Sequence, residues 1–473
     1  MELRDKSFLV AGAGKSGIAA IELLKEKKAS VRLYDGNKDL NIEELRKCNS
    51  ALQDVEVLCG ELSEEWMDWP DILVLSPGIP TDLPFVDRMR DKGVQIWGEI
   101  ELAYAFGKGK VVAITGTNGK TTTTTLVGEI LKAQYEKVDV VGNIGIPYTQ
   151  VVPHQQEDTM TVAEISSFQL ETTHEFHPVV SAILNITPDH LNRHHTMENY
   201  VVTKEAICAK QTSQDVCVLN YDNEYTRDFA ERCSATPVLF SSSTELEDGF
   251  FYKDGAIFRS GKRPENTGYV SGDRVSYHDG STEPVRLMDV SEMNLVGMCN
   301  FENVMAALAI AESMNVPLKT ALSVIRQFKA VEHRIEFVAT KRGVDYYNDS
   351  KGTNPDAAIQ GIKAMTKPTL LIGGGYDKGS EYDEWIESFD GKVKLLVLIG
   401  ATREKIRECA EKHGVENIVL ADSFEEAMDV CIENAKEGDA VLLSPACASW
   451  GMFTCYEERG RVFKEIVNAI REN

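Results

Sequence analysis

The sequence predicts an α/β protein that folds as three domains with mostly parallel sheets. The chain has 473 residues, a length that suits about three domains, each burying its own core. Glycine-rich turns join an apolar strand to a helix near residue 12 and again near residue 116. After residue 330, apolar strands alternate with helical segments once more, as in other α/β folds. We therefore expect domains over residues 1–107, 108–330 and 331–473.

The first domain begins with an apolar strand at Ser7–Ala11, which runs into a glycine-rich turn at residues 12–17. The turn has the G-x-G-x-x-G spacing, and the acidic residue Asp35 follows about twenty residues later, as in Rossmann-like nucleotide-binding units. A further strand at Ile72–Leu75 ends in the loop 76–80. Loops of this kind lie at the carboxyl edge of the sheet, where such folds bind ligands. The pattern favours nucleotide binding over a purely structural turn.

The second domain is expected to follow an amphipathic helix at 99–105 and a glycine-containing linker at 106–110. Its first strand, 111–114, leads into a turn that ends in Lys120 and Thr121. The glycines of such a turn let backbone N–H groups face phosphate oxygens, the lysine adds a positive charge, and the threonine hydroxyl suits Mg²⁺. Two residues separate its glycines where the usual P-loop has four, so an ordinary strand-to-helix turn is the alternative. The turn predicts a P-loop-type ATPase domain that binds ATP through Gly116, Thr117, Asn118, Gly119, Lys120, Thr121 and Thr122.

A carboxylate follows the next strand of this domain, because Glu164 comes directly after residues 161–163. A carboxylate at a strand end beside a phosphate loop suits Mg²⁺, and a favourable charge at a helix N-terminus is the alternative. Residues 241–291 are polar and rich in turns, which predicts a β-rich excursion within the domain. Helical periodicity resumes at 303–314 and 318–328.

The third domain is expected to be a Rossmann-like α/β unit. Its expected strands are residues 344–347, 370–372, 395–399 and Ala440–Leu443. Lys378 lies in a glycine-rich turn after the second of these strands. Taken alone, such a turn is also compatible with a solvated lysine that binds nothing.

The charge and cysteine pattern restrict the class of partner. The formal net charge is −24, and neither nucleic acid nor an anionic membrane attracts a polyanion. The ten cysteines are scattered without a C-x-x-C pair, which indicates reduced thiols. We find no signal-peptide pattern and no apolar run of membrane-spanning length. We therefore expect a cytoplasmic monomer that acts on small molecules and binds neither nucleic acid nor membrane.

A second set of motifs identifies a family. The string 182–194 joins a strand to Asp189 and a histidine cluster, and Lys204 follows; alone, it is equally compatible with a structural turn. Together with the phosphate loop and Glu164, in this order, it resembles the Mur ligases, the ATP-dependent amide-forming enzymes of peptidoglycan precursor synthesis. The resemblance covers nearly the whole chain through further motifs at 142–145, 331–336, 348–354 and 443–450.

Within the family, the chain is most similar to the ligases that add D-glutamate to UDP-N-acetylmuramoyl-L-alanine. The similarity rests on the segment 443–460 and on the loop 76–79 of the Rossmann-like opening, which in those enzymes holds the UDP moiety. The resemblance implies a carbon–nitrogen ligase. ATP phosphorylates the substrate carboxylate, and the amine of the amino acid attacks the acyl phosphate, so that ADP and phosphate are released.

The resemblance also implies a set of site residues, grouped by ligand. Catalysis is assigned to Lys120, His190 and Lys204, and Mg²⁺, as two ions, to Thr121, Glu164, His190 and Lys204 as a carbamate. The UDP substrate is assigned to Gly14, Ser16, Gly17, Asp35, Ser76, Pro77, Gly78 and Asn143. Beyond the phosphate loop, ATP is assigned to Asn300, Asn303, Arg334 and Asp349. D-Glutamate is assigned to Thr353, Lys378, Ser449 and Tyr456.

Some residues depart from the family pattern. Cys299 stands where a histidine often precedes Asn300, and Asn192 stands where an aspartate often follows the histidine. Trp450 and Tyr456 are bulkier or more polar than common alternatives. We therefore expect differences in adenine packing, in the surroundings of the metal and in the shape of the amino-acid pocket.

Several alternatives stay open at this point. Within the family, another ligase with a different amino acid is one alternative: the ligases that add L-alanine share a glycine-rich N-terminus, and those that add diaminopimelate or lysine share the centre. The chain lacks the Asp-Asn-Pro-Arg string of the diaminopimelate form. Folylpolyglutamate synthetases share the central loop but not the Rossmann-like opening. From another class, the turn 12–17 with Asp35 fits an NAD-dependent oxidoreductase, although the chain offers no hydride-transfer site to accompany it. An ATP-gated binding protein is a third possibility, which the presence of metal, phosphate and acceptor residues disfavours.

Overall fold

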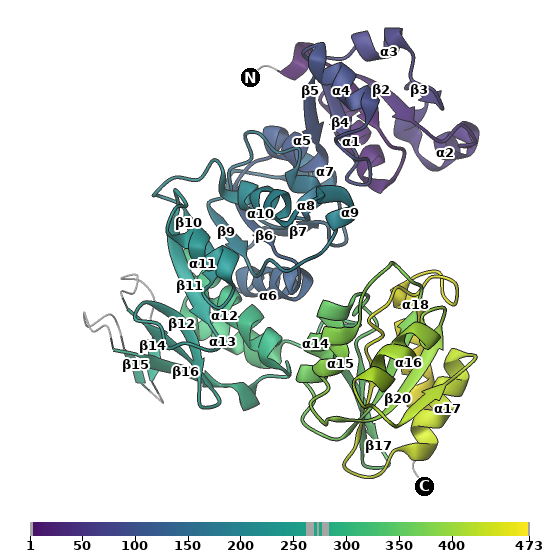
Figure 1. Ribbon diagram of the computed structural model, residues 1–473. Coiled ribbons are helices and arrows are strands. Elements are labelled where there is room, and N and C mark those ends of the chain that lie inside the picture. Colours follow the sequence, from purple (N-terminus) through teal and green to yellow (C-terminus); the bar gives the residue numbers. More distant parts are fainter. Residues whose placement is uncertain (1–2, 262–268, 272–273, 277–282, 472–473) are drawn as a thin grey trace. The chain divides into compact units, whose positions relative to one another are not determined.

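A computed structural model describes residues 3–261, 269–271, 274–276 and 283–471 of the chain (Figure 1). It confirms the expected α/β class with three domains, and the described residues form sheets of five, nine, two and six strands. By its internal contacts the chain divides into two compact units, which are Met1–Met288 with Asn303–Ile325 and Asp289–Glu302 with Arg326–Asn473. We describe each unit by itself. Among the described residues, we find no helix with the length and apolar character needed to cross a membrane.

The N-terminal sheet has five parallel strands in the order β3-β2-β1-β4-β5. The strands are β1 Ser7–Ala11, β2 Ser30–Asp35, β3 Glu56–Cys59, β4 Ile72–Leu75 and β5 Gln95–Gly98. The helices are α1 Lys15–Glu26, α2 Ile42–Cys48, α3 Glu64–Asp68, α4 Pro84–Asp91 and α5 Glu99–Phe106, with short 3-10 turns at Leu3–Asp5 and Ser50–Leu52. Since β1 pairs with both β2 and β4, the strand order reverses between β1 and β4. This switch point is where doubly wound sheets bind ligands.

Helix α5 is not amphipathic, contrary to the expectation, because its glutamates are buried. Glu99 and Glu101 are 2% and 1% exposed. Glu99 Oε1 accepts hydrogen bonds from the Thr149 backbone N, at 2.6 Å, and from Thr149 Oγ1, at 2.8 Å. The Glu101 carboxylate accepts three backbone N–H bonds from residues 174–176. These carboxylates join α5 to central loops far away in sequence, so the local pattern does not reveal their burial.

The central sheet has nine strands in the order β16-β13-β12-β11-β10-β9-β6-β8-β7. The strands are β6 Lys110–Thr115, β7 Val138–Gly142, β8 Met160–Glu164, β9 Val180–Ile183, β10 Val216–Asn220, β11 Thr236–Ser241, β12 Gly249–Lys253, β13 Ala256–Ser260 and β16 Val285–Asp289. Pairing is parallel along β7, β8, β6, β9, β10, β11 and β12, and antiparallel between β12 and β13. The central position of β6 places the phosphate loop between the ends of β8 and β9.

The helices around the central sheet are α6 Lys120–Lys132, α7 Tyr148–Val151, α8 Ser167–Leu170, α9 Leu191–His194, α10 Met197–Glu205, α11 Glu224–Ala230, α12 Met298–Ser313 and α13 Leu318–Gln327. Three 3-10 turns are Val152–His154, Ala206–Cys208 and Val290–Glu292. The expected β-rich excursion proves to be partly an extension of the central sheet by β12, β13 and β16. A separate two-stranded sheet is formed by β14 Tyr269–Ser271 and β15 Arg274–Ser276. Residues 262–268, 272–273 and 277–282 of this segment lie outside the described residues.

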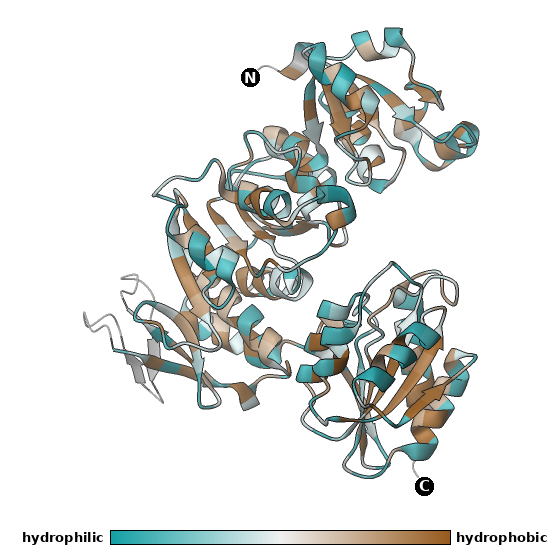
Figure 2. Ribbon diagram, in the orientation of Figure 1, coloured by the Kyte–Doolittle hydropathy of each residue, from teal (hydrophilic) through white to brown (hydrophobic). Residues whose placement is uncertain are grey.

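The C-terminal sheet has six strands in the order β17-β18-β22-β19-β20-β21, with only β17 antiparallel to its neighbour among the described pairs. They are β17 Glu336–Lys341, β18 Val344–Asn348, β19 Thr369–Gly375, β20 Val393–Gly400, β21 Ile418–Leu420 and β22 Ala440–Leu443. The helices are α14 Pro355–Lys363, α15 Asp383–Glu387, α16 Arg403–Lys412, α17 Phe424–Asn434 and α18 Tyr456–Ala469. Four strands were expected here, and the edge strands β17 and β21 were not. Figure 2 shows hydrophobic residues along the strands, as expected for a sheet covered by helices on both faces.

Candidate functional site

The phosphate loop lies between β6 and α6, where the sequence predicts it. Gly119 has φ +83°, a left-handed conformation that favours glycine, and a Cβ here would collide with Asn303 Oδ1. Lys120 Nζ donates hydrogen bonds to the carbonyl oxygens of Gly116 and Thr117, both at 2.8 Å. The ammonium group is therefore held over the loop, in position to meet phosphate oxygens.

Two residues after β9 hold the loop from the side, and the sequence did not assign them this role. The Asn118 backbone N donates to Asn185 Oδ1 at 2.8 Å, and Asn185 Nδ2 donates to Asn118 O at 3.2 Å. Thr117 Oγ1 accepts a hydrogen bond from the Thr187 backbone N at 3.0 Å. Since β9 pairs with β6, the two strand ends are adjacent. Asn185 and Thr187 thus fix the backbone that must face the phosphates.

Glu164 ends β8 beside this loop and is 2% exposed. Its Oε1 accepts a hydrogen bond from Asn143 Nδ2 at 2.8 Å, whereas Oε2 is buried without a hydrogen-bond partner among the described residues. A buried carboxylate oxygen that lacks a donor is costly. The open oxygen is therefore suited to a bound cation, and it fits the oxygen preference of Mg²⁺.

Lys204 on α10 is 1% exposed, and its Nζ donates a hydrogen bond to Gly116 O at 2.9 Å. The ammonium also lies 4.7 Å from the centroid of the Tyr200 ring. Burial, and then the nearby charge of Lys120, lower the pKa of Lys204 well below its usual value. A buried amine of this kind favours its neutral form, and a neutral amine is the nucleophilic form.

His190 lies in a more exposed position than Glu164 and Lys204. It has φ +54°, its backbone N donates to Asp189 Oδ1 at 2.9 Å, and its side chain is 48% exposed. The imidazole lies 4.8 Å from the ring of Phe168, measured between centroids. Because Mg²⁺ prefers oxygen ligands, the imidazole of His190 is a less suitable magnesium ligand than the carboxylate of Glu164.

The residues expected to bind the UDP substrate gather at the switch point of the N-terminal sheet, with one exception. Asp35 Oδ2 accepts a hydrogen bond from the Ala13 backbone N at 2.8 Å, and Ser76 Oγ donates to Gly12 O at 3.4 Å. The expected residues here lie at or directly after the ends of β1, β2 and β4, and they are Gly14, Ser16, Gly17, Asp35, Ser76, Pro77 and Gly78. Asn143 lies instead on the central domain beside Glu164. A hydrogen bond from Lys15 Nζ to Gly145 O brings the loop of Asn143 to the glycine-rich turn.

Arg193 binds the loop 76–80 to the central domain, a role that the sequence did not reveal. Its guanidinium donates to Pro77 O at 2.9 Å and to Ile79 O at 3.1 Å. The same group pairs with Glu171, with Nη2 to Oε2 at 2.6 Å and Nε to Oε1 at 3.2 Å. Both side chains are largely buried, at 11% and 12% exposure. This charge-assisted pair holds the loop in place.

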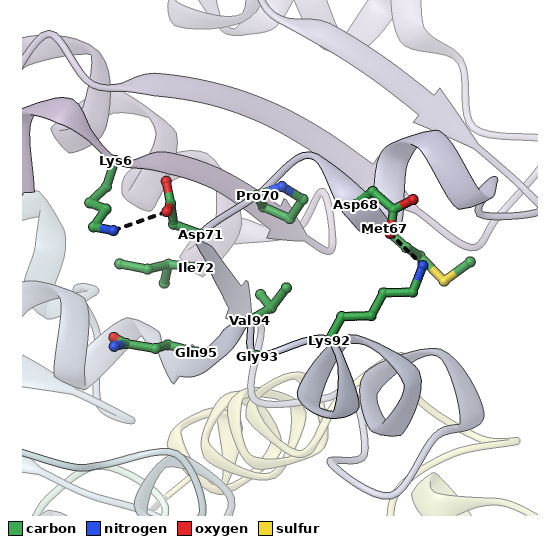
Figure 3. Close-up of a pocket in the computed structure, with 10 residues that line it drawn as sticks. All are labelled: Lys6, Met67, Asp68, Pro70, Asp71, Ile72, Lys92, Gly93, Val94 and Gln95. Carbon is green, nitrogen blue, oxygen red and sulfur yellow. Dashed lines mark hydrogen bonds and ion pairs between the residues drawn. The ribbon is translucent and has the colours of Figure 1, made fainter.

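A cavity of about 270 Å³ lies at the opposite edge of the N-terminal sheet, where β4 and β5 begin (Figure 3). Its lysines are bonded to carboxylates: Lys6 Nζ is 3.0 Å from Asp71 Oδ1, and Lys92 pairs with Asp68. The residues expected to bind ligands lie at the carboxyl ends of the strands, so they do not line this cavity. We therefore place the site at the carboxyl edge.

In the second unit, Asp349 and Arg334 lie near the carboxyl ends of β18 and β22. Asp349 Oδ2 accepts from Ser444 Oγ at 2.7 Å, and Oδ1 accepts from the Ile335 backbone N at 3.2 Å. Burial raises the pKa of Asp349 to about 7, although the Ser444 hydrogen bond and the charge of Arg334 oppose this. Arg334 Nε is buried without a hydrogen-bond partner among the described residues. This group is suited to an anionic ligand.

The residues expected to bind D-glutamate share this edge, since Thr353, Ser449 and Lys378 follow β18, β22 and β19, and Tyr456 begins α18. Lys378 is exposed, and its Nζ lies 5.2 Å from the centroid of the Trp450 ring. Trp450 is 52% exposed, which is high for so large an apolar group. The loops therefore present a cation and an aromatic face to solvent.

Asn300 and Asn303, two of the residues assigned to ATP, lie on α12 but in different units. Asn300 Nδ2 donates to Val296 O at 2.7 Å within the second unit. Asn303 Oδ1 accepts a hydrogen bond from Thr123 Oγ1 at 3.2 Å within the first unit. Asn303 therefore lies against α6 and the phosphate loop.

Comparison with known proteins places the whole chain in one family. The models "Mur ligase MurD-like, N-terminal domain", "Mur ligase middle domain" and "Mur ligase, glutamate ligase domain" match residues 6–98, 114–311 and 333–447. A UDP-N-acetylmuramoylalanine–D-glutamate ligase from Lachnospira eligens is 54% identical over 470 residues, covering 99% of this chain and all of that protein. A protein of the same name from Clostridioides difficile is 42% identical over 476 residues, covering all of both chains.

Solved structures share the fold at low sequence identity. MurC from Thermotoga maritima, a UDP-N-acetylmuramate-alanine ligase, has a TM-score of 0.59 at 16% identity and covers 98% of this chain and 100% of its own. MurF from the same organism, solved in complex with ADP, has a TM-score of 0.57 at 17% identity and covers 99% of this chain and 96% of its own. At these identities the likeness concerns the fold alone.

Proposed function

The chain belongs to the Mur ligase family, and from this premise we propose that it adds D-glutamate to UDP-N-acetylmuramoyl-L-alanine in peptidoglycan precursor synthesis. The reaction forms an amide bond and consumes ATP, as in an ATP-dependent carbon–nitrogen ligase. The observation that carries the proposal is the 42–54% identity, over the full chain, to relatives named for this reaction. The carboxyl edges of the three sheets support it, because each presents groups suited to one of the ligands.

The proposed chemistry has two steps. The γ-phosphoryl group of ATP moves to the carboxylate of UDP-N-acetylmuramoyl-L-alanine, which releases ADP and leaves an acyl phosphate. The amine of D-glutamate then attacks the acyl carbon, the C–N bond forms, and phosphate leaves. The loop 116–122 holds the phosphates, and the Lys120 ammonium, held over this loop by the carbonyl oxygens of Gly116 and Thr117, stabilises the charge that develops on them.

We assign Mg²⁺, as two ions, to Glu164, Thr121, His190 and a carbamate of Lys204. Glu164 fits the ion best, because its buried Oε2 has no hydrogen-bond donor within the part of the chain that the structure describes. When bound, the ions supply positive charge to the phosphate oxygens during transfer. The chain itself positions these ligands on four elements: Thr121 in the first turn of α6, Glu164 at the end of β8, His190 directly before α9 and Lys204 near the end of α10.

The surroundings of Lys204 favour carbamate formation. Its neutral amine attacks CO₂, an N–C bond forms, one C=O π bond opens, and a proton is released to solvent. The lowered pKa of the buried amine supplies the reactive form. The product carries a negative charge, so the repulsion between Lys204 and Lys120 becomes an attraction. The carbamate oxygens are then suited to Mg²⁺.

We assign the remaining ligands as the sequence predicts. Thr353, Lys378, Ser449 and Tyr456 bind D-glutamate, whose two carboxylates suit a cation and hydroxyl donors. Arg334, Asp349, Asn300 and Asn303 bind the nucleotide, and the edge of the N-terminal sheet with Asn143 binds the UDP moiety. We further propose that the protein acts as a cytoplasmic monomer, with domains at 1–107, 108–330 and 331–473.

The decisive experiment measures phosphate release from ATP and Mg²⁺ in the presence of UDP-N-acetylmuramoyl-L-alanine. D-Glutamate is compared in parallel with L-glutamate, L-alanine, L-lysine and diaminopimelate. We expect release with D-glutamate only. Release with another amino acid would keep the ligase chemistry but contradict the amino-acid assignment, and no release with any would contradict the proposal. Protection against thermal unfolding by NADH instead of UDP would favour the oxidoreductase alternative.

A further inference from the structure

A cluster of unlike side chains lies between α15 and α16 of the C-terminal domain. Asp383 is the first residue of α15, Cys409 lies on α16, and His413 follows the last residue of α16. One possible ligand atom from each of the three lies within 4.8 Å of the other two. His413 Nε2 and Asp383 Oδ1 are 3.0 Å apart. Carboxylate, thiol and imidazole therefore converge on one small volume.

The spacing of these residues explains why they meet. Cys409 and His413 are four residues apart, and so are Asp383 and Glu387. Side chains at positions i and i+4 lie on the same face of a helix. Each of the two helical segments thus offers a pair of polar groups to the other. Pairs of this kind from two facing helices are a common source of metal ligands.

The two nitrogens of His413 have separate partners. Nε2 faces Asp383, and Nδ1 lies 3.8 Å from Glu387 Oε1. A histidine that binds a metal through one nitrogen usually donates its other N–H to a carboxylate or carbonyl, which fixes the tautomer. Glu387 lies on the Nδ1 side of the ring, which is the side this role requires, while Nε2 faces Asp383.

We propose that Asp383, Cys409 and His413 bind a transition-metal ion of the zinc class, with Glu387 orienting the imidazole. A set of carboxylate oxygen, thiolate sulfur and imidazole nitrogen suits Zn²⁺, whereas Mg²⁺ takes oxygen ligands. Three protein ligands leave the fourth tetrahedral position to water. The site shares no residue with those assigned to the ligase reaction, so it does not depend on the proposed function.

The position of the cluster gives an ion access to it. A hollow of about 500 Å³ is lined by Glu387 and His413 but not by Asp383 or Cys409, so access to the cluster rests on the exposure of its carboxylates. The Asp383 and Glu387 side chains are 57% and 65% exposed, and exposed ion pairs contribute little stability. The alternative interpretation is a metal-free cluster in which His413 Nε2 and the Cys409 thiol are both hydrogen-bonded to the Asp383 carboxylate. The contribution of that thiol is therefore the feature to test.

The first experiment titrates the full-length, chelator-treated protein with Zn²⁺ against a chromophoric chelator. An excess of Mg²⁺ is present to occupy sites that prefer oxygen ligands. We expect one tightly bound Zn²⁺ per chain. Cys409→Ser and His413→Gln should each weaken this binding by about 100-fold or more, and Glu387→Gln by about tenfold, as for partners outside the first ligand set. Absence of a tight site, or equal affinity in the Cys409→Ser and His413→Gln proteins, would overturn the proposal.

The second experiment replaces Zn²⁺ with Co²⁺ and records the absorption of the full-length protein. A cysteine ligand gives a thiolate-to-cobalt charge-transfer band. We expect the band in the wild type and its loss in Cys409→Ser. The matched control is Cys48→Ser, which removes an exposed thiol on α2 of the N-terminal domain and should keep the band. A band that survives Cys409→Ser but disappears with Cys48→Ser would assign the thiolate elsewhere and contradict the proposed site. Unchanged thermal unfolding of the metal-free variants confirms that they fold.

Discussion

At the carboxyl edge of the central sheet and at that of the C-terminal sheet, a buried charged side chain has an atom without a hydrogen-bond partner, and the two side chains have opposite charge. On the central sheet it is Glu164 Oε2, an anion beside the phosphate loop. On the C-terminal sheet it is Arg334 Nε, a cation, while the nearby Asp349 carboxylate is bonded through both oxygens. Both statements concern the described residues.

This difference indicates what each edge is built to receive. An unsatisfied buried group is costly in the free protein, and a ligand of opposite charge removes that cost. The central edge therefore suits a cation and the phosphates that accompany it. The C-terminal edge suits an anion, such as a phosphate or an amino-acid carboxylate. Substitutions at the two edges should consequently affect different ligands.

The largest effect is expected for Lys204→Ala on the central edge. Loss of a metal-holding carbamate should lower the rate by about 10²–10³-fold, the range for removal of one group that stabilises transition-state charge. Short carboxylic acids such as acetate should restore part of the rate by occupying the vacated space. Lys210→Ala, which alters an exposed lysine paired with Glu175, is the control and should be fully active. Full activity of Lys204→Ala without added acid would contradict the carbamate assignment.

Glu164→Gln tests whether the unbonded carboxylate oxygen of Glu164 binds a cation. The amide keeps an oxygen for Asn143 Nδ2 but places an N–H₂ group where the open oxygen was. We expect the Mg²⁺ concentration for half-maximal rate to rise by about tenfold or more, equal to roughly 1.4 kcal/mol of lost binding. The melting temperature should not fall, since a buried charge has been removed. Glu157→Gln, at an exposed side chain, should leave the Mg²⁺ dependence unchanged, and an equal response of both variants would argue against a cation at Glu164.

From the sequence we could predict which residues lie at the carboxyl edges of the two sheets. We could not predict the long-range contacts that hold the surrounding loops in place. The strand-turn-helix pattern places Lys120 at the start of α6, and a short apolar run indicates the strand β8, which ends at Glu164. Arg193, in contrast, bonds Pro77 and Ile79 across more than 110 residues of sequence, and a local pattern carries no signal for such a contact. The same applies to the burial of the α5 glutamates, because the groups that bond them lie on loops far away in the chain.

On the C-terminal edge, Lys378→Ala tests whether the exposed lysine binds a carboxylate. A charge-assisted hydrogen bond contributes about 1.5–3 kcal/mol, so the KM for D-glutamate should rise by about tenfold or more. The KM for ATP should stay within about twofold, because the nucleotide is assigned to other residues. The control is Lys392→Ala, which alters a half-buried lysine of this domain that is bonded to Lys363 O and lies outside the assigned site. An unchanged KM for D-glutamate would identify Lys378 as a solvated turn residue.

The smallest effect concerns the fully bonded carboxylate of the C-terminal edge. Burial raises the pKa of Asp349 to about 7, from 3.8. Between these two values the native state holds a proton that the unfolded chain does not, so this group lowers stability as the pH rises, by up to about 1.4 kcal/mol per pH unit. Asp349→Asn removes that dependence. The melting temperature of the wild type minus that of the variant should therefore increase as the pH falls from 7 to 5, by about 2–4 °C per unit. A difference that is constant or decreases over this range would show that the Asp349 carboxyl is already ionised at pH 5. The C-terminal edge would then hold an open cation beside a charged carboxylate, and its preference for anions would be weaker than the comparison with Glu164 implies.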